Sequence, residues 1–235
     1  MSGDFSELTV VILIACSAVV AITMHEAAHG FVAWRLGDPT PLEMGRVTIN
    51  PFRHLDLVGT VIIPAVILAL PTPNRFMFGW AKPVPIDPLK MRRPRRDMLL
   101  VAAVGPLANL VVALIFALLQ AVLGILGLES GVLGGLFSAM IFVNVMIALF
   151  NLIPLPPLDG GQVAVHLLPE GLAWRYKRLE PFGFAIILVV FFLLPLVSGW
   201  LGSEIDPFDA IVRPLVEAVV QGLERVTGAT VLRLW

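Results

Sequence analysis

Two histidines and a glutamate are the residues best suited to chemistry in this chain of 235 residues. They lie in the sequence HEAAH at residues 25–29, so His25 and His29 are four residues apart. Residues at this spacing share one face of a helix, and both imidazoles can therefore bind a single metal ion. Imidazole nitrogen suits Zn²⁺, and Glu26 can act as general base toward a water molecule that the ion activates. The motif thus predicts a catalytic zinc site.

The third protein ligand of this zinc site must come from elsewhere in the chain. A catalytic zinc ion commonly has three protein ligands and keeps a fourth position for water, and we expect one such ion per chain. The candidates are His54, His166 and the carboxylates next to apolar segments. Asp159 is the strongest of them, because it follows an apolar segment at the membrane depth expected for the two histidines. His54 and His166 are more typical of structural histidines at helix ends.

The surroundings of the motif are those of a membrane protein. Hydrophobic residues make up 58% of the chain and charged residues 14%, with a mean hydropathy of +0.92. Ordinary globular domains are roughly half apolar and about a quarter charged. Ionisable groups are costly in hydrocarbon, so they are read as functional when they occur there. The net charge of −1 gives no reason to expect a nucleic acid partner, and a single cysteine, Cys16, excludes a cysteine-based zinc site.

Five apolar segments must position these groups in the lipid bilayer, and four of them are long enough to cross it. A spanning helix needs about 20 apolar residues. The segment at residues 57–70 has only 14 and contains Gly59 and Pro64, which favours a re-entrant or half-spanning element. We therefore predict an all-α multi-pass membrane protein with about four transmembrane helices. The four long segments are residues 8–34, 98–128, 132–155 and 182–201.

Two further stretches are expected to be extended. Residues 45–50 and 78–85 contain β-branched and aromatic residues punctuated by proline and glycine, which predicts a small β element in the loop at the cytoplasmic membrane edge. In the second stretch, Lys82 and Val84 keep backbone N–H groups next to prolines, which have none. These two residues are therefore candidate substrate-binding residues, able to pair with an extended peptide by strand addition.

The chain divides into a core and a tail in this interpretation. Residues 1–201 are expected to form the membrane-embedded core, and residues 202–235 a tail whose amphipathic helix lies in the outer membrane interface. The loops at residues 35–97 and 159–181 hold 13 of the 16 lysines and arginines. The positive-inside rule places these loops in the cytoplasm and both termini outside. The zinc site is therefore expected on the cytoplasmic side of a cell membrane, which we take to be bacterial or archaeal.

Three motifs give this chain a specific resemblance to a known family. HEAAH at residues 25–29, GPLAN at residues 105–109 and NLIPLPPLDG at residues 151–160 resemble the signature motifs of the site-2 protease family of intramembrane zinc metalloproteases. They also occur in the family's order. The resemblance implies a zinc metalloendopeptidase that hydrolyses peptide bonds within transmembrane segments of other membrane proteins, as in regulated intramembrane proteolysis.

The resemblance also implies roles for individual residues. It makes His25, His29 and Asp159 the zinc ligands and Glu26 the general base of catalysis. These assignments agree with the metal pair found from spacing, and they select one of the candidates for the third ligand.

Three asparagines in the apolar segments carry two interpretations. The resemblance implies that Asn151 steadies the substrate or the oxyanion as a second catalytic residue, and that Asn109 belongs to the substrate-binding part of the site. Considered as residues alone, Asn109, Asn144 and Asn151 are also explained by hydrogen bonds between membrane helices, because an unpaired amide is costly in an apolar environment.

Two departures from the family indicate a chain close to a bare catalytic core. About 40 mostly apolar residues separate Asn109 from Asn151, too few for the PDZ domain that many members carry there. The tail is also too short for the nucleotide-sensing domain of other members. Substrates must then be selected by the core itself, by its cytoplasmic loop or by an accessory membrane regulator.

Two other functions remain open at this point: a membrane metal-binding or transport protein, and a catalytically silent scaffold. A transporter needs no glutamate placed as a base, and its polar groups should line a path across the membrane. Here the polar groups are expected at one depth. The intact Glu26 argues against a silent scaffold.

Overall fold

The protein is built from helices around a set of membrane spans. The computed structural model describes residues 5–69, 79–129, 131–201, 203 and 205–232. Four helical segments in this part of the chain are long and apolar enough to cross a membrane, as predicted. They are α1 (Glu7–Arg35), α4 (Pro94–Ile125), α5 (Val132–Asn151) and the segment Glu180–Trp200, which consists of α8 (Glu180–Leu188), η4 (Val189–Leu193) and α9 (Leu194–Trp200).

Shorter helices connect and flank these spans. In chain order they are α2 (Thr40–Glu43), η1 (Pro51–Arg53), η2 (Leu57–Ile62), α3 (Ile63–Ala69), η3 (Pro88–Lys90), α6 (Asp159–Leu167), α7 (Glu170–Lys177), η5 (Phe208–Val212) and α10 (Arg213–Thr227).

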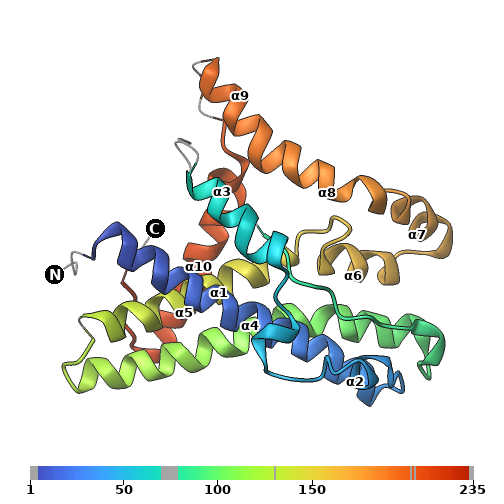
Figure 1. Ribbon diagram of the computed structural model, residues 1–235, viewed down its shortest axis with the longest axis horizontal. Coiled ribbons are helices and arrows are strands. Elements are labelled where there is room, and N and C mark those ends of the chain that lie inside the picture. The colour runs from blue at the N-terminus through green and yellow to red at the C-terminus, as the bar shows by residue number, and fades with distance from the viewer. Residues whose placement is uncertain (1–4, 70–78, 130, 202, 204, 233–235) are drawn as a thin grey trace.

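The core of the molecule is a bundle of α1, α4 and α5, which pack against one another along their lengths (Figure 1). Small residues allow membrane helices to approach closely, and Ala113 and Ala117 of α4 are fully buried in this bundle. Ile141 and Val145 of α5 belong to the same buried cluster. The bundle therefore gives a rigid frame for side chains that α1 and α4 direct toward each other.

The motif at residues 25–29 lies near the carboxyl end of α1. Ser6 caps the amino end of this helix by accepting a hydrogen bond from Thr9 N at 3.2 Å, and the helix ends at Arg35. At about 1.5 Å per residue, His29 lies about 9 Å from the last residue of the helix. This depth suits a site that is inside the membrane but close to one of its surfaces.

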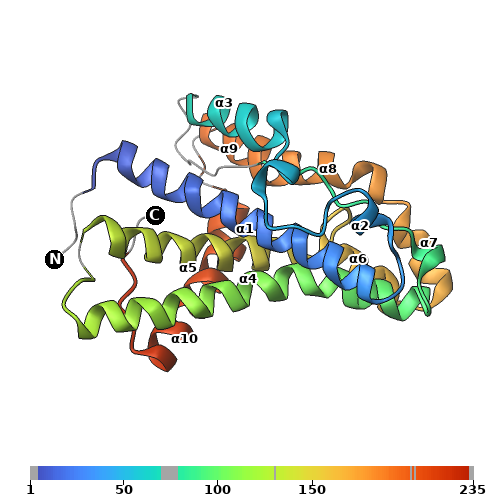
Figure 2. The ribbon, with the colours of Figure 1, turned by 60° about the horizontal axis from the view of Figure 1, so that its bottom comes forward.

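The fourth span leans away from the bundle. Only 17% of its apolar window is buried within the molecule, against 56% for α5. In the view of Figure 1, α3 is drawn between this span and α1, and Figure 2 shows α3 next to α9. The predicted short segment at residues 57–70 corresponds to η2 and α3, and residue 70 lies outside the described residues. Thr60 and Val61 of η2 and Pro64 of α3 line the same cavity as residues of α1.

The small β element predicted from residues 45–50 and 78–85 is wrong. The part of the chain that the structure describes contains no β-strand, and residue 78 lies outside it. One isolated antiparallel bridge joins Ala81 to Leu55, which lies outside the first of these stretches.

Residues 79–85 do not form a strand, because their backbone groups bond to side chains and to single carbonyl groups elsewhere in the chain instead of to a partner strand. Pro83 has no N–H to donate, and one guanidinium nitrogen of Arg46 donates to the carbonyls of Lys82 and Pro83 at 2.8 and 2.7 Å. The N–H of Val84 donates to the carboxylate of Glu26. We call residues 79–85 the 79–85 segment below.

The tail contributes a helix that packs on the bundle. In α10, Val216 and Val220 are buried in the same cluster as residues of α4 and α5, and Figure 2 shows α10 on the side opposite α3. Leu215 and Val226 are exposed. The division into a core at residues 1–201 and a tail at 202–235, and the place of the tail at the membrane interface, stay predictions.

Candidate active site

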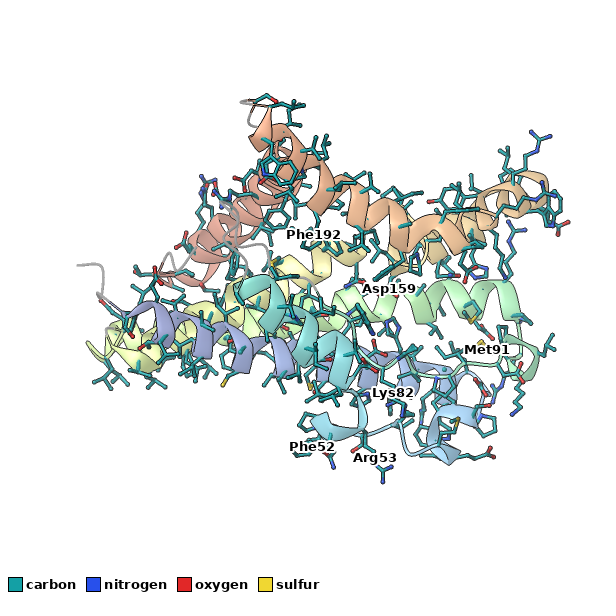
Figure 3. All side chains as sticks on the ribbon, turned by 45° about the horizontal axis from the view of Figure 1, so that its top comes forward. Phe52, Arg53, Lys82, Met91, Asp159 and Phe192 are labelled. Atoms are coloured by element: carbon teal, nitrogen blue, oxygen red, sulfur yellow. The ribbon has the colours of Figure 1, made fainter. Side chains whose placement is uncertain are left out.

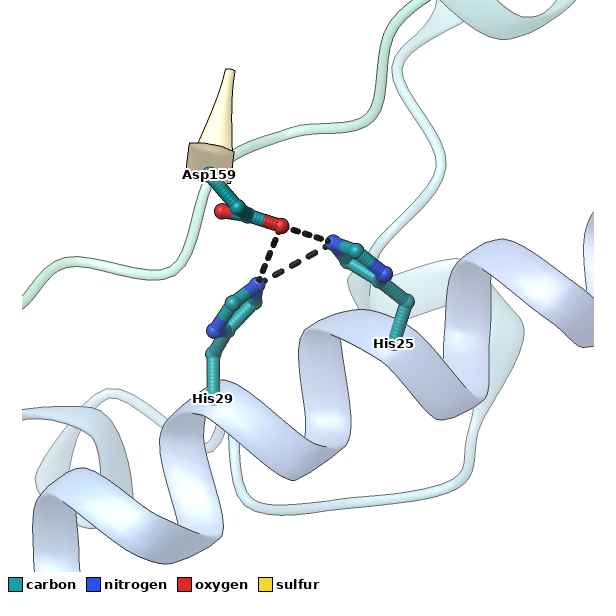
Figure 4. A group of neighbouring side chains, drawn as sticks. All are labelled: His25, His29 and Asp159. Carbon is teal, nitrogen blue, oxygen red and sulfur yellow. Dashed lines mark hydrogen bonds and ion pairs between the residues drawn. The ribbon is translucent and has the colours of Figure 1, made fainter. Parts of the chain in front are cut away.

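Three side chains from two distant parts of the chain meet at one point beside α1 (Figure 4). His25 and His29 project from one face of the helix, and their Nε2 atoms are 3.1 Å apart. Asp159, the first residue of α6, places Oδ2 2.9 Å from Nε2 of His25 and 3.4 Å from Nε2 of His29. One ligand atom from each residue lies within 4.8 Å of the others, an arrangement that can hold a metal ion.

Asp159 reaches this point because the chain folds back sharply after α5. The helix ends at Asn151, and the prolines that follow cannot continue it. The next residue after Asp159 is Gly160, where a Cβ atom would lie 2.3 Å from the carbonyl oxygen of Leu152. Only glycine permits this approach, so the end of α5 and the start of α6 lie side by side with the carboxylate facing α1.

The two imidazoles are held from behind by α4. The Nδ1 atom of His29 is 2.7 Å from the carbonyl oxygen of Val101, and Nδ1 of His25 is 2.6 Å from Oδ1 of Asn109. An imidazole nitrogen that faces an oxygen acceptor carries the hydrogen, and the other nitrogen then keeps its lone pair. The lone pairs on both Nε2 atoms therefore point into the site.

Gly105 makes this contact between α4 and the imidazoles sterically feasible. A Cβ atom at this position would lie 2.4 Å from Nε2 of His29 and 2.7 Å from Cε1 of His25. Those distances are well inside ordinary van der Waals contact. The glycine of the GPLAN motif is thus a space requirement of the site.

The electrostatics of the cluster fit a cation. The carboxylate of Asp159 faces the same point as the two Nε2 atoms. Its Oδ2 atom is buried against these two nitrogens. Two nitrogen lone pairs and a carboxylate oxygen therefore face one another, which is favourable only with positive charge between them. Two imidazoles and one carboxylate are a known ligand set of catalytic zinc.

Glu26 lies on the cavity side of the metal cluster. Its Oε2 atom accepts a hydrogen bond of 3.2 Å from the backbone N–H of Val84, so the 79–85 segment crosses directly over the carboxylate. Arg46, which is buried, fixes this segment through the carbonyls of Lys82 and Pro83. The side chain of Lys82 is exposed, and its N–H donates to the carbonyl of His54 at 2.8 Å.

A cavity of about 880 Å³ opens beside the cluster. Apolar residues of α1, α3, α5 and α8 form most of its wall, and His25, Glu26, His29 and Asp159 also line it. Figure 3 shows Asp159 in the interior of the molecule, between the faint ribbons of α4 and the later helices. Asn151 also lines the cavity, and its Nδ2 donates to the carbonyl of Ile147 at 3.0 Å. Gln162, on α6, adds a carboxamide to the wall that the sequence had not indicated.

The remaining candidates lie outside the metal cluster. Asn109 is fully buried behind His25 and bonds to it from α4. His54 is fully buried near η1, with Nε2 2.8 Å from the carbonyl of Thr48. His166 lies at the end of α6, where burial and the nearby Arg95 and Lys177 lower its pKa, so it is mainly neutral.

Comparisons with known proteins agree with this arrangement. The model of peptidase family M50 matches residues 127–198. A Bacillus subtilis protein named "Putative zinc metalloprotease YwhC" is 36% identical over 210 residues, covering 84% of this chain and 91% of the relative. A Mycobacterium tuberculosis protein named "Putative zinc metalloprotease Rip2" is 29% identical over 199 residues, covering 81% and 70%. No solved structure matches the chain.

The similarity to the Bacillus protein extends over nearly its whole length, and four apolar spans surround the ligand cluster. The cofactor of the protein is zinc, and its activity is that of a metalloprotease within the membrane. The chain belongs to peptidase family M50, the site-2 proteases.

Proposed function

We propose that His25, His29 and Asp159 hold the zinc ion of this protease, one per chain, and that Glu26 is its general base. The observation that carries the proposal is the meeting of three ligand atoms within 4.8 Å of one another, with Glu26 one residue from the first ligand and facing the cavity. The burial of Oδ2 of Asp159 against the two Nε2 atoms supports it, because a cation at this point would give all three atoms a partner.

The residues around the zinc ion divide the work of peptide hydrolysis. Bound zinc supplies Lewis acidity, which activates water at neutral pH and polarises a carbonyl oxygen. Glu26 takes the proton from the attacking water and passes it to the leaving amine. The Nδ2 of Asn151 gives one hydrogen to the carbonyl of Ile147. We assign its second hydrogen to the substrate oxygen on which negative charge develops.

The substrates that suit this site are transmembrane segments of other membrane proteins. The cavity wall is mainly apolar and lies among membrane spans. A helical substrate hides its carbonyls in hydrogen bonds, so it must unwind before water can attack. The N–H of Val84, in the 79–85 segment, is the donor nearest to Glu26 that an unwound strand can use; the N–H of Lys82 is already bound by His54.

The charge distribution supports a cytoplasmic location for the active site. The loops at residues 35–97 and 159–181 hold most of the lysines and arginines, and the ligand cluster lies at the ends of α1 and α5 next to these loops. The relatives come from bacteria. We therefore assign the chain to a bacterial cell membrane, in regulated intramembrane proteolysis, with its site toward the cytoplasm and an accessory membrane protein as the regulator.

The decisive experiment compares the wild-type protein with Glu26→Gln in detergent or lipid vesicles. A panel of single-span membrane proteins serves as substrate, and zinc is measured by mass spectrometry. We expect both proteins to hold one zinc ion per chain, and cleavage by Glu26→Gln to fall by about 10²–10⁴-fold, the usual contribution of a general base. Cleavage at the wild-type rate by Glu26→Gln would refute the role of Glu26. Undiminished zinc in Asp159→Ala would refute the ligand set.

A further inference from the structure

We propose that Asn109 and Asn144 are positioning residues that set the tautomer and orientation of His25, and thereby the affinity of the site for zinc. This inference rests on the proposed zinc site and adds to it a side-chain relay through three helices. The relay runs from α5 through α4 to the metal-facing histidine of α1.

The hydrogen bonds of the relay have a fixed direction. Asn144 donates from Nδ2 to the carbonyl of Met140 at 2.8 Å, so its Oδ1 is left to accept. Asn109 donates from Nδ2 to that Oδ1 at 2.9 Å and to the carbonyl of Ala21 at 3.1 Å. Both hydrogens of the Asn109 amide are thus used. Its Oδ1 then faces Nδ1 of His25 at 2.6 Å.

The opposite orientation of the Asn109 amide is unfavourable. It would place Oδ1 against two other acceptors, the carbonyl of Ala21 and Oδ1 of Asn144, and would turn Nδ2 toward His25. The contacts of Asn109 with Ala21, Asn144 and His25 together determine the orientation of its amide, so Oδ1 is the atom that faces His25. Nδ1 of His25 must therefore carry the hydrogen. The lone pair of His25 is therefore on Nε2, the atom that faces Asp159.

The burial of Asn109 and Asn144 argues against direct contact of either residue with substrate. Asn109 and Asn144 are both fully buried, and they lie among α1, α4 and α5 on the far side of His25 from the cavity. A substrate in the cavity meets His25 and Glu26 first. The asparagines therefore act on the reaction through the histidine.

The two histidines differ in how they are held. His29 bonds to the backbone carbonyl of Val101, which no side-chain substitution removes. His25 depends on the side chain of Asn109. Partners that orient a metal-bound histidine typically contribute about 10–100-fold to metal affinity. Loss of Asn109 should thus release one ligand of the zinc ion while leaving the other in place.

The chain contains a matched control for the loss of a buried amide. Gln120 lies on α4 about three turns beyond Asn109, on the same face. It is 1% exposed, and its Nε2 donates to the carbonyl of Thr230 at 3.0 Å. Gln120→Leu likewise removes a buried hydrogen bond of an α4 carboxamide, here to the segment that follows α10, far from the histidines.

The experiment measures zinc affinity of the full-length purified protein by chelator competition, together with the visible spectrum after loading with Co²⁺. We expect Asn109→Leu to bind zinc about 10–100-fold more weakly and to change the Co²⁺ spectrum. Asn144→Leu should have a smaller effect, since Ala21 still orients Asn109. Asn109→Asp should recover only part of the affinity, because one carboxylate oxygen accepts from His25 while the other faces the carbonyl of Ala21 and Oδ1 of Asn144. Gln120→Leu should leave affinity and spectrum unchanged.

Wild-type affinity in Asn109→Leu would overturn the proposal, and so would an equal loss in Gln120→Leu, which would show that helix packing alone is responsible. The Asp159→Ala variant distinguishes a failure of the relay from a failure of the zinc site itself. If Asp159→Ala loses zinc while Asn109→Leu keeps it, only the relay is refuted. If both keep zinc, the metal site proposed above is refuted with it.

Discussion

Replacement of Gly105 by alanine should damage the active site although it favours the helix. In the interior of a helix, alanine is about 0.8–1.0 kcal/mol more favourable than glycine. Propensity alone therefore predicts a protein at least as stable as the wild type. The geometry predicts the opposite effect on function, because the new methyl group would lie 2.4 Å from Nε2 of His29, 2.6 Å from its Cε1 and 2.7 Å from Cε1 of His25.

The size of the damage follows from these distances. Carbon atoms normally approach to about 3.5–4.0 Å, so the imidazoles or the helix must move by roughly 1 Å. The imidazoles have little freedom, since Val101 and Asn109 hold their Nδ1 atoms. Metal sites require their ligand distances to within about 0.2 Å, and a displacement of about 1 Å can cost 10²-fold in rate. We expect Gly105→Ala to lose most of its zinc and to cleave at least about 10²-fold more slowly.

The assay compares zinc content, cleavage of a transmembrane substrate and thermal unfolding. Because residue 105 precedes Pro106, the added Cβ also crowds the proline ring, so zinc content decides the matter and stability alone does not. Gly222→Ala on α10 is the control: a Cβ there meets nothing within 4 Å, and zinc and cleavage should be unchanged. Native zinc content and cleavage in Gly105→Ala would refute the close contact between α4 and the histidines.

Three other predictions concern the 79–85 segment and the topology. Val84→Pro, which lacks the N–H that an unwound substrate would use, should impair cleavage far more than Val84→Ala while zinc content stays the same; equal rates would remove the segment from the mechanism. Arg46→Met leaves two backbone carbonyls without their charged donor and should lower the free energy of unfolding by about 1.5–3 kcal/mol, measured by chemical denaturation. In a background without Cys16, a cysteine at the exposed Phe52 should be labelled from the cytoplasmic side only, and labelling from outside would invert the topology.

The sequence was sufficient for the four spans and for placing His25 and His29 together, because both depend on simple spacing, while their role as zinc ligands stays a proposal. Apolar runs of bilayer length appear as the four spanning segments. The spacing of His25 and His29 places them on one helix face. Asp159 was a candidate for the same site because of its expected depth in the membrane. These features depend on the period of a helix and on the thickness of a membrane.

What the sequence could not show are contacts that depend on how helices meet. The bond between Asn109 and His25 needs the distance between α4 and α1, which no local pattern contains. The β element was wrong for a similar reason: the extended residue types were present, but Arg46 took carbonyls that a second strand would have used. The glycine and proline inside the apolar segment at residues 98–128 were the available signal for close approach.

If Glu26 is the general base as proposed, its bond to Val84 would couple the binding of substrate to the release of that base. One N–H serves one strong acceptor at a time, so a substrate carbonyl that takes the Val84 hydrogen leaves the carboxylate without that donor. In the empty enzyme the base remains engaged by the chain itself. Binding of an unwound peptide would then itself release the base. A folded helix in the bilayer, whose backbone groups are already paired, would leave the base bound to Val84.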